Sequence, residues 1–238
     1  MKILSLLLLV SMLFGCAMSA GQGQFINYQG NDILTEGNAK ALPRNERLNA
    51  ITKDMSKVGF QRTKVSYIFD AFSDSVLSIY RNQFELMKEH KALLDNHKDV
   101  MSFLMANKGK DDDELKQAIA QFDAGADSEE HKIGPKIQSY EAASDRIWKE
   151  NAKLTLEISA QALELGVVIY NSTKGSKKLE DFIAADLLSM LASANKINEA
   201  YKLAEIRLHL SKLANNFIED EQAIIDISKR LQDHQNDN

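Results

Sequence analysis

Two histidines stand in the segment LMKEHKALLDNHKDVM, and the imidazole ring is a common ligand of transition metals. His90 and His97 are seven residues apart, which places them about 10 Å apart along a helix axis. Metal-binding pairs on a helix usually lie three or four residues apart, as in Glu-x-x-His. Met87 and Leu94 occupy the positions three before the histidines. We therefore expect no metal at this segment and no cofactor elsewhere in the chain.

The two histidines share one heptad position with Gln83, which lies seven residues before His90. We interpret Gln83, His90 and His97 as polar positions in a helix core, where such residues fix the register of packed helices. Residues on other helices that are expected to face this row are Ser144, Asn151, Gln161 and Asp220. Protonation of the histidines near pH 6 would then loosen the core.

The acidic run from Lys110 to Glu114 does not have the pattern of a calcium loop, which alternates oxygen ligands around a central glycine. Carboxylates at the start of a helix complement the helix dipole, and this role accounts for the run. The chain contains no Gly-x-Ser-x-Gly motif, phosphate-binding loop or dinucleotide-binding motif. We therefore predict that the protein is not an enzyme.

The single cysteine of the chain, Cys16, directly follows a short apolar segment. Lys2 is followed by apolar residues from Ile3 to Phe14, a run shorter than the roughly 20 residues of a spanning helix. A basic start, a short apolar core and small residues after it are typical of a secretory signal. The end of this segment, Leu-Phe-Gly-Cys at 13–16, resembles the lipobox of bacterial lipoproteins, which has leucine three positions before the cysteine and a small residue just before it.

This resemblance implies that residues 1–15 are a signal peptide and that Cys16 carries palmitate-like acyl chains. Two or more acyl chains hold a protein on a bilayer durably, whereas one holds it reversibly. Ala17 follows the cysteine where lipoproteins of the inner membrane usually have aspartate, so the resemblance implies the outer membrane. Whether the body faces the periplasm or the outside stays open. The alternatives are a secreted protein with one unpaired thiol and a retained signal anchor.

Behind Cys16 the chain is rich in glycine, and the prediction is a flexible lipidated tether over 16–42, in which the segment FINYQGNDIL at 25–34 is the candidate to pack back on the body. Residues 43–238 then form a single helical-bundle domain. The formal net charge of −5 argues against nucleic acid as a partner, since nucleic acid selects basic surfaces.

Apolar residues recur with the heptad-like spacing of packed or coiled-coil helices throughout the body. The repeat predicts long helices over 62–107, 136–172 and 178–232, with short helices over 43–58 and 111–123. No alternating segment predicts a strand. The expected fold is all-α: an elongated antiparallel bundle of about three long helices with short helices added.

The turn between the last two long helices is the candidate contact surface. Lys174, Lys177 and Lys178 make the turn basic. Apolar residues on either side of it are Val168, Ile169, Tyr170 and Phe182. Because a three-helix core covers one face of each helix, part of the apolar surface over 163–191 is expected to be left for a partner or for anionic lipid head groups. Coverage by the tether or by a short helix is the alternative.

Together these features predict a non-enzymatic envelope lipoprotein that serves as an interaction or structural module. Its expected partners are the bilayer, through acylated Cys16, and a protein of the cell envelope. A membrane-active, pore-forming-like helical protein is one alternative. A small-ligand sensor that uses the bundle core is another.

Overall fold

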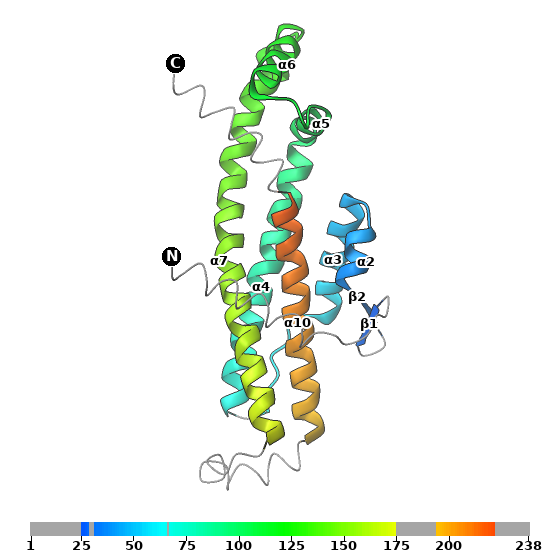
Figure 1. Ribbon diagram of the computed structural model, residues 1–238, viewed down its shortest axis with the longest axis vertical. Coiled ribbons are helices and arrows are strands. Elements are labelled where there is room, and N and C mark those ends of the chain that lie inside the picture. Colours follow the sequence, from blue (N-terminus) through cyan, green and yellow to red (C-terminus); the bar gives the residue numbers. More distant parts are fainter. Residues whose placement is uncertain (1–24, 29–30, 66, 175–193, 222–238) are drawn as a thin grey trace.

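Three long helices form the body of the protein, and the prediction of an all-α helical bundle is confirmed (Figure 1). The computed structural model describes residues 25–28, 31–65, 67–174 and 194–221. Helices α4 (Tyr67–Asn96), α7 (Ile133–Lys174) and α10 (Ala194–Asp220) pack against one another along the bundle. Side chains from all three fill the core, among them Leu86, Ile147, Leu154, Leu210 and Phe217.

The helix predicted over 62–107 begins later and is interrupted. Helix α4 starts at Tyr67, and His97 leaves the helical conformation with φ −123° and ψ 38° before α5 (Lys98–Ala106) begins. The polar residues Asp95, Asn96 and Asp99 surround the break, and short polar side chains favour helix ends over helix interiors. Asp99 accepts a hydrogen bond from the backbone N–H of Val100 at 2.9 Å. The apolar repeat continues through this break and so hides it.

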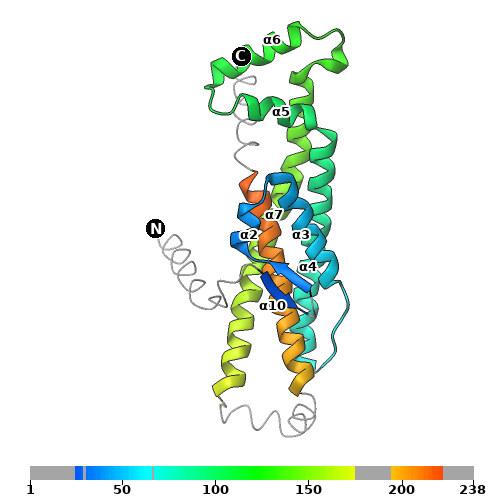
Figure 2. The same ribbon diagram turned by 90° about the vertical axis from the view of Figure 1, so that its right-hand side faces the viewer.

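Helices α5 and α6 (Asp112–Ala124) lie across one end of the bundle (Figure 2). Asp111 caps α6 through a reciprocal capping box with Glu114, which is the role expected for the acidic run. A 3-10 turn, η1 (Glu129–His131), leads back to α7. Asp123 of α6 accepts a hydrogen bond from the backbone N–H of Ile133 at 2.6 Å, so α6 also caps the first turn of α7.

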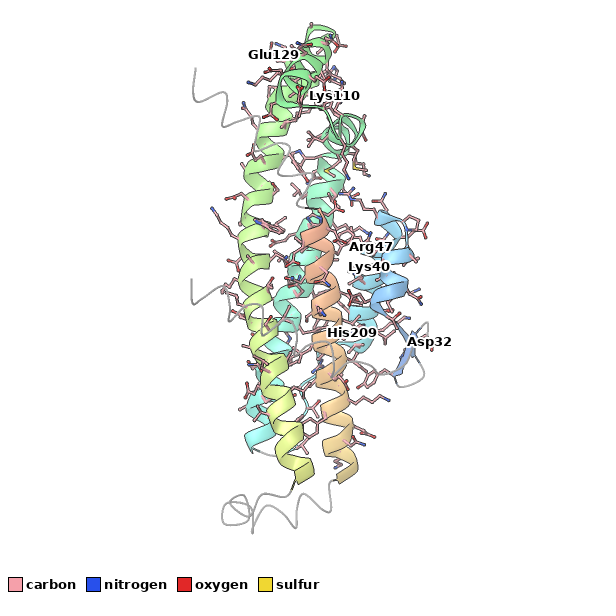
Figure 3. The ribbon with its side chains drawn as sticks, viewed as in Figure 1. Asp32, Lys40, Arg47, Lys110, Glu129 and His209 are labelled. Carbon is pink, nitrogen blue, oxygen red and sulfur yellow. The ribbon has the colours of Figure 1, made fainter. Side chains whose placement is uncertain are left out.

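The N-terminal part of the body corrects two expectations, a flexible tether over the whole of 16–42 and a chain without strands. Strands β1 (Phe25–Tyr28) and β2 (Asn31–Leu34) form an antiparallel hairpin, and helices α2 (Glu36–Ala41) and α3 (Arg44–Val58) follow. The hairpin is held because Ile33 is fully buried and the Leu34 N–H donates to the Asp54 carboxylate at 2.8 Å. His209 on α10 donates to the Leu34 carbonyl at 2.8 Å (Figure 3).

Helix α3 packs on α10 and α4 and is fixed at both of its ends. At its start Arg47 pairs with Asp220 at 2.7 Å, and Arg44 pairs with Glu221. At its end the chain turns at Gly59, whose φ of 72° favours glycine. The buried guanidinium of Arg207 donates to the carbonyls of Gly59 and Gln61, at 3.1 and 2.8 Å. This segment therefore has a definite position against α10.

Candidate functional site

A buried polar cluster joins the three long helices at mid-bundle. The Gln83 side-chain amide on α4 donates to the Asn151 side-chain oxygen on α7 at 3.1 Å. Asn151 in turn donates to the Asn215 backbone carbonyl on α10 at 3.2 Å. All three residues are buried, with Gln83 and Asn151 fully so. The cluster therefore sets the register of α7 against both of its neighbours.

Of the residues expected to face the polar row, Asn151 is the one that bonds to it. Ser144 donates to the Glu141 carbonyl of its own helix at 2.9 Å. Gln161 donates to Glu164, also on α7, and Asp220 pairs with Arg47 on α3. His97 lies at the break between α4 and α5, half-buried, with its ring edge-on to Tyr140. It therefore marks the end of the long helix and is not part of a continuous core row.

His90 is buried at 1% exposure, and its ring lies edge-on to Phe217. Burial lowers the pKa of His90 from 6.5 to about 4, and the nearby Arg44 guanidinium acts in the same direction. His90 is therefore neutral at pH 6, which corrects the expectation that it charges there. Its charge change falls in a more acidic range.

Acidification is expected to destabilise the protein through His90. Below pH 6.5 the unfolded chain binds a proton at this histidine that the folded chain does not take up until about pH 4. The free energy of unfolding should therefore fall across this range, by up to about 3 kcal/mol. Urea titrations from pH 7.5 to 4 measure it. The His90→Gln variant serves as the matched control, because its side chain has no charge to gain. Parallel pH curves for the two proteins would contradict the assignment.

The outward face of α7 carries an apolar stripe. Leu156, Leu163 and Val167 are 72%, 45% and 58% exposed, and Ala160 between them is exposed as well. The successive spacings of four, three and four residues place these side chains on one face of the helix. We call these four residues the α7 stripe. Because these side chains are exposed, this face of α7 is accessible to another molecule.

The same helix has a second apolar face, which points into the bundle. Leu154, Ile158 and Leu165 are each at most 7% exposed. Helix α7 is thus apolar on two sides, whereas a helix at the margin of a bundle needs one apolar face. The surplus face is the feature of this body that most resembles a binding surface.

Charged side chains of opposite sign border the α7 stripe. Lys153 lies before its centre and Glu164 after it, and both are exposed. The Lys153 ammonium lies 3.9 Å from the Glu150 carboxylate of the same helix. The Glu164 carboxylate accepts a hydrogen bond from the Gln161 side-chain amide at 3.1 Å. These contacts are exposed and contribute little, so both side chains are available to a partner.

The predicted contact surface near the turn overlaps the α7 stripe at one end. The backbone of Val168, Ile169, Tyr170 and Lys174 belongs to α7, but their side chains lie outside the described residues. Lys177, Lys178, Phe182 and the predicted lipidation site Cys16 also lie outside them. Leu156 was not predicted as a surface residue. The apolar residues between 156 and 167, spaced by four, three and four positions, were the sequence signal that could have identified it.

Within the described ranges, no group of three or more His, Cys, Asp and Glu side chains is placed to hold a metal ion. Nor is any helix of the described residues long and apolar enough to cross a membrane. Comparison of the chain with protein-family models, with curated proteins and with solved structures gave no match.

Proposed function

We propose that the protein is a non-enzymatic lipoprotein of the bacterial outer membrane, anchored through Cys16, whose helical body presents a docking surface to a protein partner. The observation that carries the proposal is the α7 stripe, an apolar face on the outside of the described bundle. Apolar side chains that line up on an exposed face and are bordered by charges are typical of a helix that packs against another protein. The lipobox resemblance at Cys16 supplies the anchoring part of the proposal.

The anchor is tested with the Cys16→Ala variant. In a bacterial host the native protein should incorporate labelled palmitate and sediment with membranes, because its acyl chains hold it on the bilayer. The variant should lose the label and appear in the soluble fraction. If its fractionation matches that of the native protein, the anchoring proposal is wrong.

The docking surface is tested separately with Leu156→Ser combined with Leu163→Ser. Leu156 is 72% exposed and Leu163 is 45% exposed, so their replacement should change the free energy of unfolding by only about 1 kcal/mol. Crosslinking in intact cells should nevertheless lose the adducts that the native protein forms. Met105→Ser is the matched control, because Met105 is 49% exposed at the far end of the bundle. Unchanged adducts in the double variant would contradict the proposal.

A membrane-active protein is the second candidate, because an apolar face beside a basic segment also suits an anionic membrane surface. Lys174, Lys177 and Lys178 follow the stripe in the chain. Dye leakage from anionic liposomes distinguishes the two candidates. The docking proposal predicts no leakage with the native protein, whereas leakage that is lost in the Leu156→Ser, Leu163→Ser variant would favour the membrane-active candidate.

A further inference from the structure

We propose that the α7 stripe binds the same stripe of a second copy of the chain, with the two α7 helices antiparallel. This inference rests on the proposed function, of which it names the partner. Three observations support it: the order of residues along the stripe, the charges that border the stripe, and the position of the stripe along the bundle axis relative to the N-terminal hairpin.

The stripe is complementary to itself when two copies run in opposite directions. A two-fold axis between Ser159 and Ala160 sets Leu156 of each copy opposite Leu163 of the other. The same axis sets Ala152 opposite Val167, so each large side chain meets a leucine or a small residue. Because the residues at the axis are small, the two helices can approach closely there. A two-fold interface requires this kind of self-complementarity.

The bordering charges select the antiparallel orientation. In the register above, Lys153 of one copy lies within two residues of Glu164 of the other, a displacement of about 3 Å along the axis. The two-fold symmetry forms this pair twice. A parallel two-fold would instead put Lys153 and Glu164 of one copy on the opposite side of the contact from those of the other, so neither pair would form.

The position of the hairpin is compatible with this arrangement. The Thr155 hydroxyl on α7 donates to the Asn215 side-chain oxygen on α10 at 2.9 Å, so these two residues lie at the same level along the bundle axis. The two helices run in opposite directions, so six residues further along α7 and six residues back along α10 bring residue 161 level with residue 209. His209 bonds to the Leu34 carbonyl, and Leu34 pairs with Phe25 at the start of the described chain. The first described residues of the hairpin therefore lie level with the centre of the stripe along the bundle axis. A two-fold axis at that height brings both entry points to one level, within reach of one membrane.

The membrane anchor supplies the concentration that a small interface needs. Four apolar side chains from each copy bury less surface than the 1,200 Å² or so of a standard interface, so pairing in dilute solution is expected to be weak. Two copies held on one bilayer meet at a much higher effective concentration. The anchored protein is therefore expected to be dimeric and the released protein largely monomeric.

The arrangement is tested by disulfide trapping in membranes that contain the full chain. Cys16 is the only cysteine, and acylation removes its thiol, so one introduced cysteine is the only free thiol of the mature protein. Ala160→Cys lies at the axis and should form a disulfide-linked dimer on oxidation. Leu156→Cys should not link to itself, because the two copies are about 10 Å apart along the axis. Differently tagged Leu156→Cys and Leu163→Cys chains expressed together should link to each other.

Charge reversal tests the register independently. Lys153→Glu should lower the yield of the Ala160→Cys dimer about fivefold, since two attractive pairs become repulsive. Adding Glu164→Lys should restore the yield. Met105→Glu, remote from the stripe, should leave it unchanged. No restoration in the double variant would overturn the register.

The possible failures are distinguishable. If Cys16→Ala remains on membranes, the anchor proposal fails, whatever the crosslinks show. If the anchored Ala160→Cys protein forms no linked dimer, the second copy is not the partner, and the docking proposal stands with another protein. If Leu156→Cys links to itself as readily as Ala160→Cys does, the antiparallel arrangement is wrong.

Discussion

Replacing Arg207 by alanine is expected to lower the free energy of unfolding by about 4 kcal/mol. The side chain is 1% exposed and lies over the ring of Tyr80 at 5.8 Å. Its loss would leave a cavity and would remove the hydrogen-bond donor to the carbonyls of Gly59 and Gln61. Relief of the desolvation of the buried cation offsets part of this cost. Urea unfolding monitored by circular dichroism measures the change.

Arg207→Lys is the matched control, because it keeps the positive charge and most of the volume. A single ammonium reaches two separate carbonyls less well than the planar guanidinium does, so an intermediate loss of about 2 kcal/mol is expected. If Arg207→Ala unfolds at the same urea concentration as the native protein, the segment after α3 is not held by this side chain.

Asn151→Ala is expected to cost a similar amount, about 4 kcal/mol, because the side chain bonds to two other helices. Truncation leaves the Gln83 amide and the Asn215 carbonyl buried without their present partner, and it opens a cavity between them. Differential scanning calorimetry should show a clear drop in Tm. The cost comes from the unpaired groups more than from lost attraction.

The double variant Gln83→Leu, Asn151→Leu separates these contributions. It removes both members of the inter-helix bond and fills the space with apolar atoms, so it should be more stable than Asn151→Ala. It should also define the register of the helices less well, which broader amide resonances in solution spectra would reveal. A double variant less stable than Asn151→Ala would show that the polar pair is strongly stabilising in itself.

The three-helix architecture could be predicted because each long helix repeats its buried residues at heptad-like spacing. Phe69, Val76 and Gln83 share one such row on α4, and all three are buried. The polar exceptions to these rows gave four residues expected to face Gln83, His90 and His97, and the structure selects Asn151 among them as the partner of Gln83. Periodicity thus shows which residues are buried, whereas the pairing of polar residues between helices needs the positions of the helices.

Two parts of the fold could not be predicted from periodicity. The hairpin of Phe25–Tyr28 and Asn31–Leu34 is too short for a repeat, and it depends on tertiary bonds to Asp54 and His209. The break at His97 is hidden because Val100 and Leu104 continue the apolar row of α4 into α5. In both places contacts distant in sequence decide the local structure.

The candidate site shows a different limit of sequence reasoning. On α7 the row of Leu154, Ile158 and Leu165 and the row of Leu156, Leu163 and Val167 have similar spacing and composition. Only the positions of α4 and α10 decide that the first row is core and the second is surface. A sequence can thus reveal that a helix has two apolar faces before it reveals which one is free.

The most direct test of a membrane-anchored docking protein is the mass of the N-terminal peptide of the mature chain, purified from bacterial membranes. The proposed function predicts a peptide that begins at Cys16 and carries a diacylglyceryl group on sulfur and a third acyl chain on the amino group. A peptide that begins at Met1, or one that contains Cys16 with a free thiol, would contradict the anchor. The dimer on the bilayer surface would then lose its physical basis as well.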